Sequence, residues 1–341
     1  MSAVKPATIE DVAQLAGVSI ATVSRALNEP GKVADSTRRK VIEAVAQTGY
    51  TTNAMARNLR TRRSNMILIL APDVGDPNFS NILVGLETEA SKRGYGVLIG
   101  NTRHDPTRET DYLRFISSNQ ADGIVLLTGH LPFGLAQAHP AARLPPMVAV
   151  NEPIANAAIP FVGVDNVEAA RVATDHLVSQ GHRDIAFIGQ SSGRVVAKLR
   201  ETGFRTAMQA AGLPVEPRFV LEADGTTESG RAATERMFVR DRLPSAFFCV
   251  NDATALGVII ALTARGYTLP RDFSIMGFDD ISFASFVTPS LTTMKQPRLK
   301  IGEASMDLLL AMLEGEAPSG REILLRAELI LRNSVAMRRP A

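Results

Sequence analysis

Apolar residues in the first 50 positions recur at intervals of three and four, which is the spacing of one face of a helix. The pattern predicts three short helices, at residues 9–16, 19–27 and 35–48. Gly17 and Gly49 follow the first and third of these segments, where a left-handed C-cap is expected. The inward-facing residues of the third helix are expected to be Val41, Ile42 and Val45. Two helices joined by so short a turn, with a third that closes the core, are typical of a helix-turn-helix domain.

From residue 66 onward the pattern changes to short apolar runs of β type that alternate with stretches of helical periodicity. The predicted strands are residues 66–71, 97–100, 123–127, 148–150, 161–164, 185–188, 247–250 and 273–277. The predicted helices are residues 79–93, 106–118, 166–180, 198–211, 228–239, 252–265 and 297–314. Such alternation predicts parallel sheets with helices on both faces, with enough units for two lobes. Because ligands bind beyond the carboxyl ends of such strands, binding residues are expected directly after each strand.

Composition narrows the class of protein. The chain has 341 residues, of which 45% are hydrophobic and 21% charged, as in an ordinary globular protein with two or three folding units. Cys249 is the only cysteine, which excludes an intrachain disulfide and gives no support to a thiolate metal cluster. The sequence has neither the apolar core of a signal peptide nor a run long enough to span a membrane. We therefore expect a cytoplasmic protein with no membrane partner.

Charge is distributed unevenly along the chain. Residues 1–64 hold ten lysines and arginines against five acids, a balance of +5, whereas the net charge of the whole chain is +2. The rest of the chain therefore carries a balance of −3. A basic head on a mildly acidic body is expected when only the head meets a polyanion, although a merely solvated basic surface is the alternative.

The head carries an ordered motif that strongly resembles the signature of the LacI/GalR family of bacterial repressors. It begins with TIEDVAQLAGVSIATVSRALN at residues 8–28 and continues through residues 33–38, 49–50 and 53–59. The order of the later strands and helices also fits, so the resemblance covers essentially the whole chain. It implies a helix-turn-helix domain at residues 1–52, a hinge helix and linker at 53–64, and an effector-binding core at 65–341. It further implies that the core has two Rossmann-like lobes, as in periplasmic sugar-binding proteins, at about 65–162 with 293–318 and about 163–292 with 319–341.

The second helix of the head is the expected recognition helix. Short hydroxyl side chains near its start suit phosphate contacts, which position the protein on DNA: Ser19, Thr22 and Ser24. On its outward face, Ile20, Ala21 and Arg25 could reach base edges, with Arg25 as a bidentate donor to guanine and Ile20 beside a thymine methyl. The alternative for Arg25 is a solvated surface arginine. The resemblance also implies DNA contacts by Thr8, Asn28 and Tyr50.

Residues 53–59 resemble the family's hinge helix, which folds when two protomers sit together on DNA. Leu59 matches a leucine that inserts into the minor groove, and Asn53 and Arg57 belong to the same segment. So short a helix is unstable alone, so folding coupled to binding is physically reasonable. A plain interdomain linker with an incidental leucine is the alternative.

In the core, the resemblance assigns effector contacts to side chains that lie mostly after predicted strands. These candidate residues are Phe79, Arg194, Arg200, Asn251, Asp252 and Asp279. A carboxylate paired with an arginine fork can clamp vicinal hydroxyls, although each polar residue alone could be a loop or capping residue. Gly225 and its neighbours stand where purine-responsive members carry an aromatic, so one stacking face is missing. Other segments look most like the cytidine-repressor branch, which makes a nucleoside the first hypothesis for the effector and a sugar-like molecule the second.

Other functional classes have weaker support. The glycine-rich segment at 189–194 lacks the Lys-Ser/Thr pair of a phosphate loop, the five histidines form no metal-binding pair at helical spacing, and no nucleophile elbow occurs. We therefore expect no catalytic residue, metal site or cofactor. The expected partners are double-stranded operator DNA, a small-molecule effector and a second copy of the chain. The competing interpretation is a pure small-molecule-binding protein or a sugar-handling enzyme on the same α/β plan.

Overall fold

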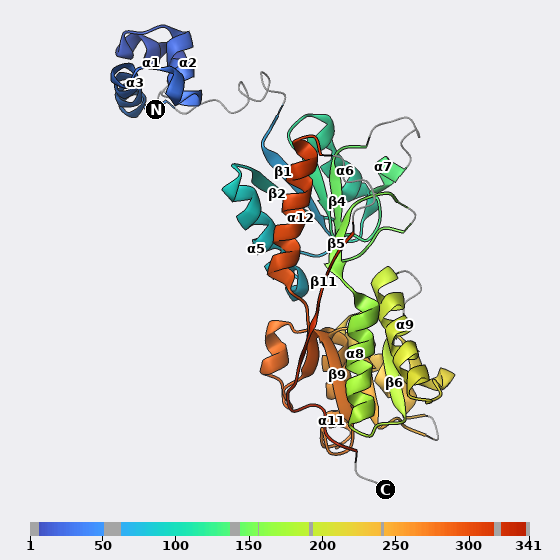
Figure 1. The fold of residues 1–341 in the computed structure, drawn as a ribbon. Helices are drawn as coiled ribbons and strands as arrows, with labels where there is room; N and C mark the ends of the chain where they lie inside the picture. Colours follow the sequence, from blue (N-terminus) through green and yellow to red (C-terminus); the bar gives the residue numbers. More distant parts are fainter. Residues whose placement is uncertain are drawn as a thin grey trace, which may run out of the picture. The chain divides into compact units, whose positions relative to one another are not determined.

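The computed structural model describes residues 7–50, 63–136, 144–155, 157–190, 194–239, 242–316 and 322–338. The chain forms two compact units, residues 1–64 and residues 65–341. The elements of each unit are drawn and labelled in Figure 1.

The first unit is a small helical head. Its elements are α1 (Ile9–Ala16), α2 (Ile20–Asn28), the 3₁₀ turn η1 (Pro30–Lys32) and α3 (Asp35–Thr48). Val12, Val23 and Val41 contribute one fully buried side chain from each helix. Gly17 and Gly49 adopt left-handed C-cap conformations with φ of 67° and 66°, as the sequence predicts. The three-helix plan is therefore confirmed.

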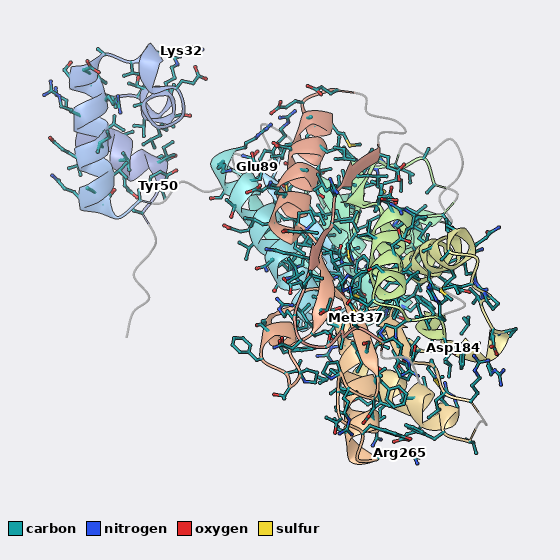
Figure 2. All side chains as sticks on the ribbon, turned by 60° about the horizontal axis from the view of Figure 1, so that its bottom comes forward. Lys32, Tyr50, Glu89, Asp184, Arg265 and Met337 are labelled. Atoms are coloured by element: carbon teal, nitrogen blue, oxygen red, sulfur yellow. The ribbon has the colours of Figure 1, made fainter. Side chains whose placement is uncertain are left out.

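One predicted core residue of the head is wrong. Ile42 is 48% exposed, while Ala44 is buried in its place. On a helix the position three after Val41 returns to the same face, whereas the next residue turns away by about 100°. Tyr50, which follows α3, packs against the head's core and is labelled in Figure 2.

The second unit begins with a lobe built on a six-stranded sheet. The strand order is β11-β5-β4-β3-β1-β2, and every pairing is parallel. The strands are β1 (Met66–Ala71), β2 (Gly96–Asn101), β3 (Gly123–Leu126), β4 (Met147–Val150), β5 (Phe161–Val164) and β11 (Glu322–Leu325). The helices are α5 (Pro77–Lys92), α6 (Pro106–Ser117), α7 (Phe133–Ala136) and α12 (Arg298–Leu313). β3 and β4 are buried along their whole length, which explains their uninterrupted apolar sequence.

The second lobe repeats this plan. Its strand order is β12-β10-β9-β8-β6-β7, and the pairings are parallel except that β12 runs antiparallel to β10. The strands are β6 (Ile185–Gln190), β7 (Val220–Glu222), β8 (Ala246–Cys249), β9 (Ser274–Asp279), β10 (Thr292–Lys295) and β12 (Glu328–Ile330). The helices are α8 (Asn166–Ser179), α9 (Val195–Ala210), α10 (Thr227–Met237) and α11 (Asp252–Ala264), with 3₁₀ turns η2 (Pro217–Phe219) and η3 (Ser282–Ser285).

The chain passes between the lobes after β5, β10 and β11. These crossings differ from the lobe boundaries expected from sequence. β10 belongs to the second lobe, and β11 belongs to the first because it pairs with β5. The sheet that a strand joins depends on its hydrogen-bonded neighbour, so hydrophobic periodicity alone does not reveal it.

Candidate DNA interface and ligand pocket

The candidate DNA-reading surface is the outward face of α2. Ile20, Ala21 and Arg25 are exposed, with Ile20 at 46%, while Val23 and Ala26 on the opposite face are buried in the head's core. This separation follows from the helical period and leaves the three outward side chains free of any packing role within the head.

The start of α2 is fixed by its own hydroxyl groups. Ser19 Oγ accepts a hydrogen bond from the backbone N–H of Thr22 at 3.1 Å, and the two hydroxyls lie 2.9 Å apart. Ser24 lies on the same helix and is partly buried. At the start of α1, Thr8 forms a capping box with Asp11. The hydroxyls of Ser19 and Thr22 therefore first serve the helix end, which is also where backbone N–H groups attract phosphate.

The remaining candidates for DNA contact are only partly covered by the structure. Asn28 is the last residue of α2. Asn53, Arg57 and Leu59 lie outside the described residues, so the hinge-helix prediction stays a prediction.

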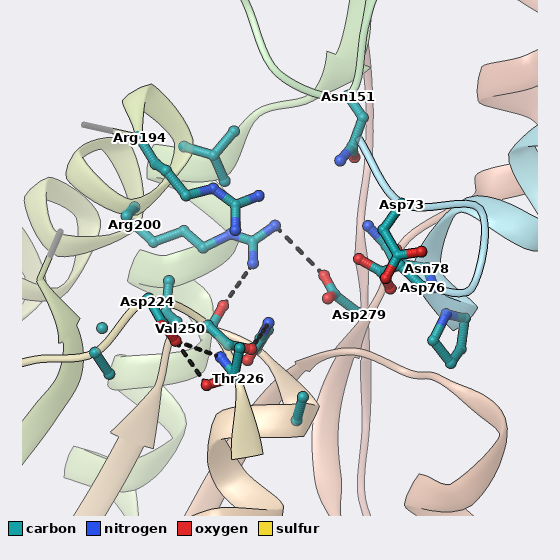
Figure 3. Close-up of a pocket in the computed structure, with 18 of the residues that line it drawn as sticks. Asp73, Asp76, Asn78, Asn151, Arg194, Arg200, Asp224, Thr226, Val250 and Asp279 are labelled. Atoms are coloured by element: carbon teal, nitrogen blue, oxygen red, sulfur yellow. Dashed lines mark hydrogen bonds and ion pairs between the residues drawn. The ribbon is translucent and has the colours of Figure 1, made fainter. Parts of the chain in front are cut away.

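In the second unit, the ends of strands from both lobes surround a pocket of about 360 Å³ (Figure 3). Four of the six predicted effector contacts line it: Arg194, Arg200, Asn251 and Asp279. Sequence reasoning missed polar residues that also line it: Asp73, Asp76, Asn78, His104, Asn151, Asp224 and Thr226. Many of these follow β1, β2, β4 and β7, so their position after a strand was the signal that could have found them.

Arg200 and Asp279 form the buried centre of the pocket. Their side chains lie 3.4 Å apart, and Arg200 also donates to Asn166 Oδ1 at 2.8 Å and to the carbonyl of Val250. The guanidinium lies 3.6 Å from the centre of the Phe278 ring. Burial raises the pKa of Asp279, and Arg200 opposes that shift by favouring the carboxylate. The planar arginine is thus held in one orientation beside a carboxylate, an arrangement suited to hydroxyl recognition.

Strained backbone marks the same edge of the sheets. Asp279 has φ of 108° and Asn151 has φ of 66°, conformations that residues with side chains rarely adopt. Both residues line the pocket. Asn151 directly follows β4 in the first lobe, and Asp279 is the last residue of β9 in the second. Such strain persists where surrounding structure enforces it and commonly accompanies ligand sites.

A second arginine connects the two lobes across the pocket. Arg194, at the start of α9, lies 3.4 Å from Glu152 Oε2, which follows β4. Gly225 leaves room beside this arginine, because a Cβ there would lie 3.3 Å from both Arg194 Nη1 and Asn251 Nδ2. Asn251 in turn donates to the carbonyl of Gly225 at 2.9 Å and caps α11. A side chain at Gly225 would therefore crowd two polar groups of the pocket lining.

Two predicted effector contacts are corrected by the structure. Phe79 is 3% exposed and belongs to the apolar cluster that contains Ile82, because α5 turns this position away from the pocket. Asp252 is fully buried and accepts hydrogen bonds from the Thr293 hydroxyl at 2.6 Å and the Ile281 N–H at 2.9 Å. Burial raises its pKa to about 8. Both side chains support the walls of the pocket without lining it.

The part of the chain that the structure covers has no helix long and apolar enough to cross a membrane. Within the same residues, no group of three or more histidine, cysteine or acidic side chains is placed to hold a metal ion.

Comparisons with known proteins agree with both units. Residues 8–53 match the model of bacterial regulatory proteins of the lacI family, and residues 174–335 match a periplasmic binding protein-like domain. The HTH-type transcriptional repressor CytR of Escherichia coli strain K12 is 39% identical over 96% of this chain and 96% of its own length. A structure of the lac repressor dimer bound to operator and the anti-inducer ONPF has a TM-score of 0.86 and 28% identity, over 97% of this chain and 100% of that one. A complex of the regulator CelR with cellobiose has a TM-score of 0.74 and 28% identity, over 96% and 100%.

The helix-turn-helix head and the two-lobed pocket together define a DNA-binding transcriptional regulator that responds to a small molecule. The chain belongs to the LacI family of bacterial regulators. The predicted family, fold class and general function are confirmed, as are the expected operator DNA, effector and dimer partner at the level of the family.

Proposed function

We propose that α2 reads a pseudo-palindromic operator in the major groove and that the pocket binds the effector that changes operator affinity. The main support for the proposal is the exposed face of α2, because Ile20, Ala21 and Arg25 have no packing role in the head and are available to contact DNA. Arg25 donates to guanine and Ile20 contacts a thymine methyl, whereas Ala21 offers no hydrogen bond. Ser19, Thr22 and Ser24 position the helix on phosphates, together with Thr8, Asn28 and Tyr50.

The hinge assignment is part of the same proposal. Residues 53–64 link a DNA-binding domain at 1–52 to a core at 65–341, and Leu59 enters the minor groove between two protomers. Asn53 and Arg57 belong to the same segment and contact the DNA. The match to the curated relative over 96% of each chain supports this overall organisation.

The effector is a nucleoside or sugar-like molecule bound by Arg194, Arg200, Asn251 and Asp279. The buried Arg200–Asp279 pair supports this class, because a carboxylate beside an arginine can hold adjacent hydroxyls. The described residues that line the pocket include the imidazole of His104 but no phenylalanine, tyrosine or tryptophan ring, so most of the contacts favour the sugar part of such a ligand. A regulator solved in complex with cellobiose is among the similar structures, which supports a sugar-like ligand.

The chain acts as a cytoplasmic repressor without catalytic activity. Relatives carrying the same two units are transcriptional repressors, which supports this proposal. An enzyme or a pure solute-binding protein on the same plan would bind its ligand without binding an operator.

Replacement of Arg25 tests the recognition surface. Arg25→Ala should lose the preference for an operator selected from random duplexes, by about 1–3 kcal/mol of discrimination at one base pair. Arg39→Ala, which removes an exposed arginine from α3, is the charge-matched control and should weaken all duplexes alike. Binding is measured by fluorescence anisotropy with operator and scrambled duplexes at fixed salt. An Arg25→Ala protein that keeps full operator preference would refute the assignment.

A further inference from the structure

The charged side chains of the pocket are not balanced. Its lining includes two arginines and four aspartates: Arg194, Arg200, Asp73, Asp76, Asp224 and Asp279. Each arginine already opposes a carboxylate, since Arg200 lies 3.4 Å from Asp279 and Arg194 lies 3.4 Å from Glu152. Neither arginine is therefore an unpaired cation that waits for an anionic ligand.

The other three aspartates have no lysine or arginine within 4.0 Å among the described residues. Asp73 and Asp76 accept hydrogen bonds from backbone N–H groups of their own loop, and Asp224 accepts from the N–H and hydroxyl of Thr226. Figure 3 shows Asp73 and Asp76 together on one side of the pocket and Asp224 on the other. The hydrogen bonds from Ser229 and Thr226 lower the pKa of Asp224, so this carboxyl stays ionised at neutral pH.

A neutral group adds an independent indication. Asn78 lines the pocket and is only 8% exposed, yet its Oδ1 has no hydrogen-bond partner within the described chain. A buried acceptor without a donor is costly unless a ligand supplies one. The unmet demand of the pocket is therefore for hydrogen-bond donors, which hydroxyl and amino groups supply and a phosphate dianion does not.

We infer that the pocket selects an uncharged, hydroxyl-rich metabolite and rejects the phosphate ester of that same metabolite. This inference rests on the proposed function of the pocket as the effector site. A phosphate group would meet three carboxylates, of which Asp73 and Asp224 are exposed, while the two arginines of the lining already oppose carboxylates of their own. The regulator thus senses the compound that a phosphoryl-transfer reaction consumes, and not the ester that such a reaction produces.

Matched ligand pairs test the inference on the full-length protein. Calorimetric titration compares ribose with ribose 5-phosphate, glucose with glucose 6-phosphate, and cytidine with cytidine 5′-monophosphate. In each pair that binds, the parent is expected to bind at least about tenfold more tightly, because the phosphate of the ester is repelled by the carboxylates of the pocket. Equal or tighter binding of the phosphate ester overturns the inference, as does a panel in which no parent binds at about 10 mM.

Charge-neutralising variants identify the residues responsible. Asp73→Asn and Asp224→Asn keep the side-chain shape, and each should move the ratio of ester to parent affinity toward one by about three- to tenfold. Glu152→Gln should do the same, because it releases Arg194 for the phosphate. Asp111→Asn removes an exposed carboxylate from α6 and should leave the ratio unchanged. A ratio that none of the three variants changes overturns the electrostatic explanation.

Operator binding is recorded on the same samples. Loss of operator preference in the unmodified protein would contradict the proposed function, whereas an inverted ester-to-parent ratio with intact operator binding would contradict this inference alone.

Discussion

His182 is a titratable side chain buried in the second lobe, far in sequence from its partners. One ring nitrogen lies 2.9 Å from Ser245 Oγ, and the other lies 2.9 Å from Ser274 Oγ and 3.1 Å from the carbonyl of Ala336. The side chain is 2% exposed, and burial lowers the pKa of His182 to about 4. The neutral ring therefore ties the C-terminal segment to β9 and to the loop before β8.

This histidine predicts a pH dependence of stability. Its folded pKa lies below the unfolded value of about 6.5, so its contribution is complete above pH 6.5 and is lost as the pH falls toward 4. At pH 5 the loss should reach about 2 kcal/mol, because the unfolded state binds the proton more readily. Asp252, whose pKa is raised to about 8, acts in the opposite direction, so the total change for the protein does not isolate His182.

A comparison with a variant isolates the contribution of His182 to the pH dependence of stability. His182→Gln cannot titrate in this range, so urea unfolding at pH 7 and pH 5 should show that the unmodified protein loses about 2 kcal/mol relative to the variant. Identical pH profiles for the two proteins would mean that His182 is not protonated on unfolding in this window.

At single positions, the sequence predicts which loops meet but not where each side chain points. Asn251 and Asp252 are neighbours at the start of α11, yet Asn251 lines the pocket and Asp252 turns inward to Thr293. Successive helix positions differ by about 100°, so a position after a strand is insufficient to assign a contact. Asp73 and Asp224 were missed because aspartate in a loop is equally expected to stabilise a turn.

At the scale of elements, the long helices and the buried strands follow the hydrophobic pattern closely. The sequence missed four short strands, β7, β10, β11 and β12, which have three or four residues each. β10 reads Thr-Thr-Met-Lys, and β12 reads Glu-Leu-Ile, so neither forms a purely apolar run. These strands form because they pair with neighbouring strands in the folded protein, which local propensity does not predict.

The crossing of α5 and α12 depends on two glycines. A Cβ on Gly302 would lie 2.2 Å from the carbonyl oxygen of Ile82, and one on Gly85 would lie 2.2 Å from that of Leu299. Both obstacles are backbone atoms, so no side chain can move aside to accept the added carbon. The two helices therefore touch backbone to backbone and fix one side of the first lobe.

Gly302→Ala should destabilise the protein by about 1–3 kcal/mol despite the better helix propensity of alanine, because the helices must separate. Denaturant unfolding measures the change. Lys300→Ala on the exposed face of α12 is the control and should stay within about 0.5 kcal/mol of the unmodified protein. A Gly302→Ala protein as stable as the control would show that the helix crossing is adjustable.

At the scale of the molecule, three chain crossings join the lobes around the pocket, and the described residues add the ion pair of Arg194 with Glu152. Arg298, just after the crossing that follows β10, donates to the carbonyl of Asp280, and Gln296 in the same crossing donates to Asp279. Arg194 reaches Glu152 from the opposite lobe. A ligand that contacts both lobes can therefore favour one arrangement of these links over another, which is the requirement for coupling to a second site.

Thermodynamic linkage makes this coupling testable in both directions. If an effector changes operator affinity by some factor, operator DNA must change effector affinity by the same factor, typically about 5- to 150-fold in either direction. Anisotropy measures operator affinity with and without the ligand, and calorimetry measures ligand affinity with and without the operator duplex. Arg25→Ala should abolish the effect of operator DNA on ligand affinity while leaving that affinity in the free protein unchanged. Unequal factors, or an effect that persists with a scrambled duplex, would mean that the ligand and the operator do not act on the same conformational equilibrium.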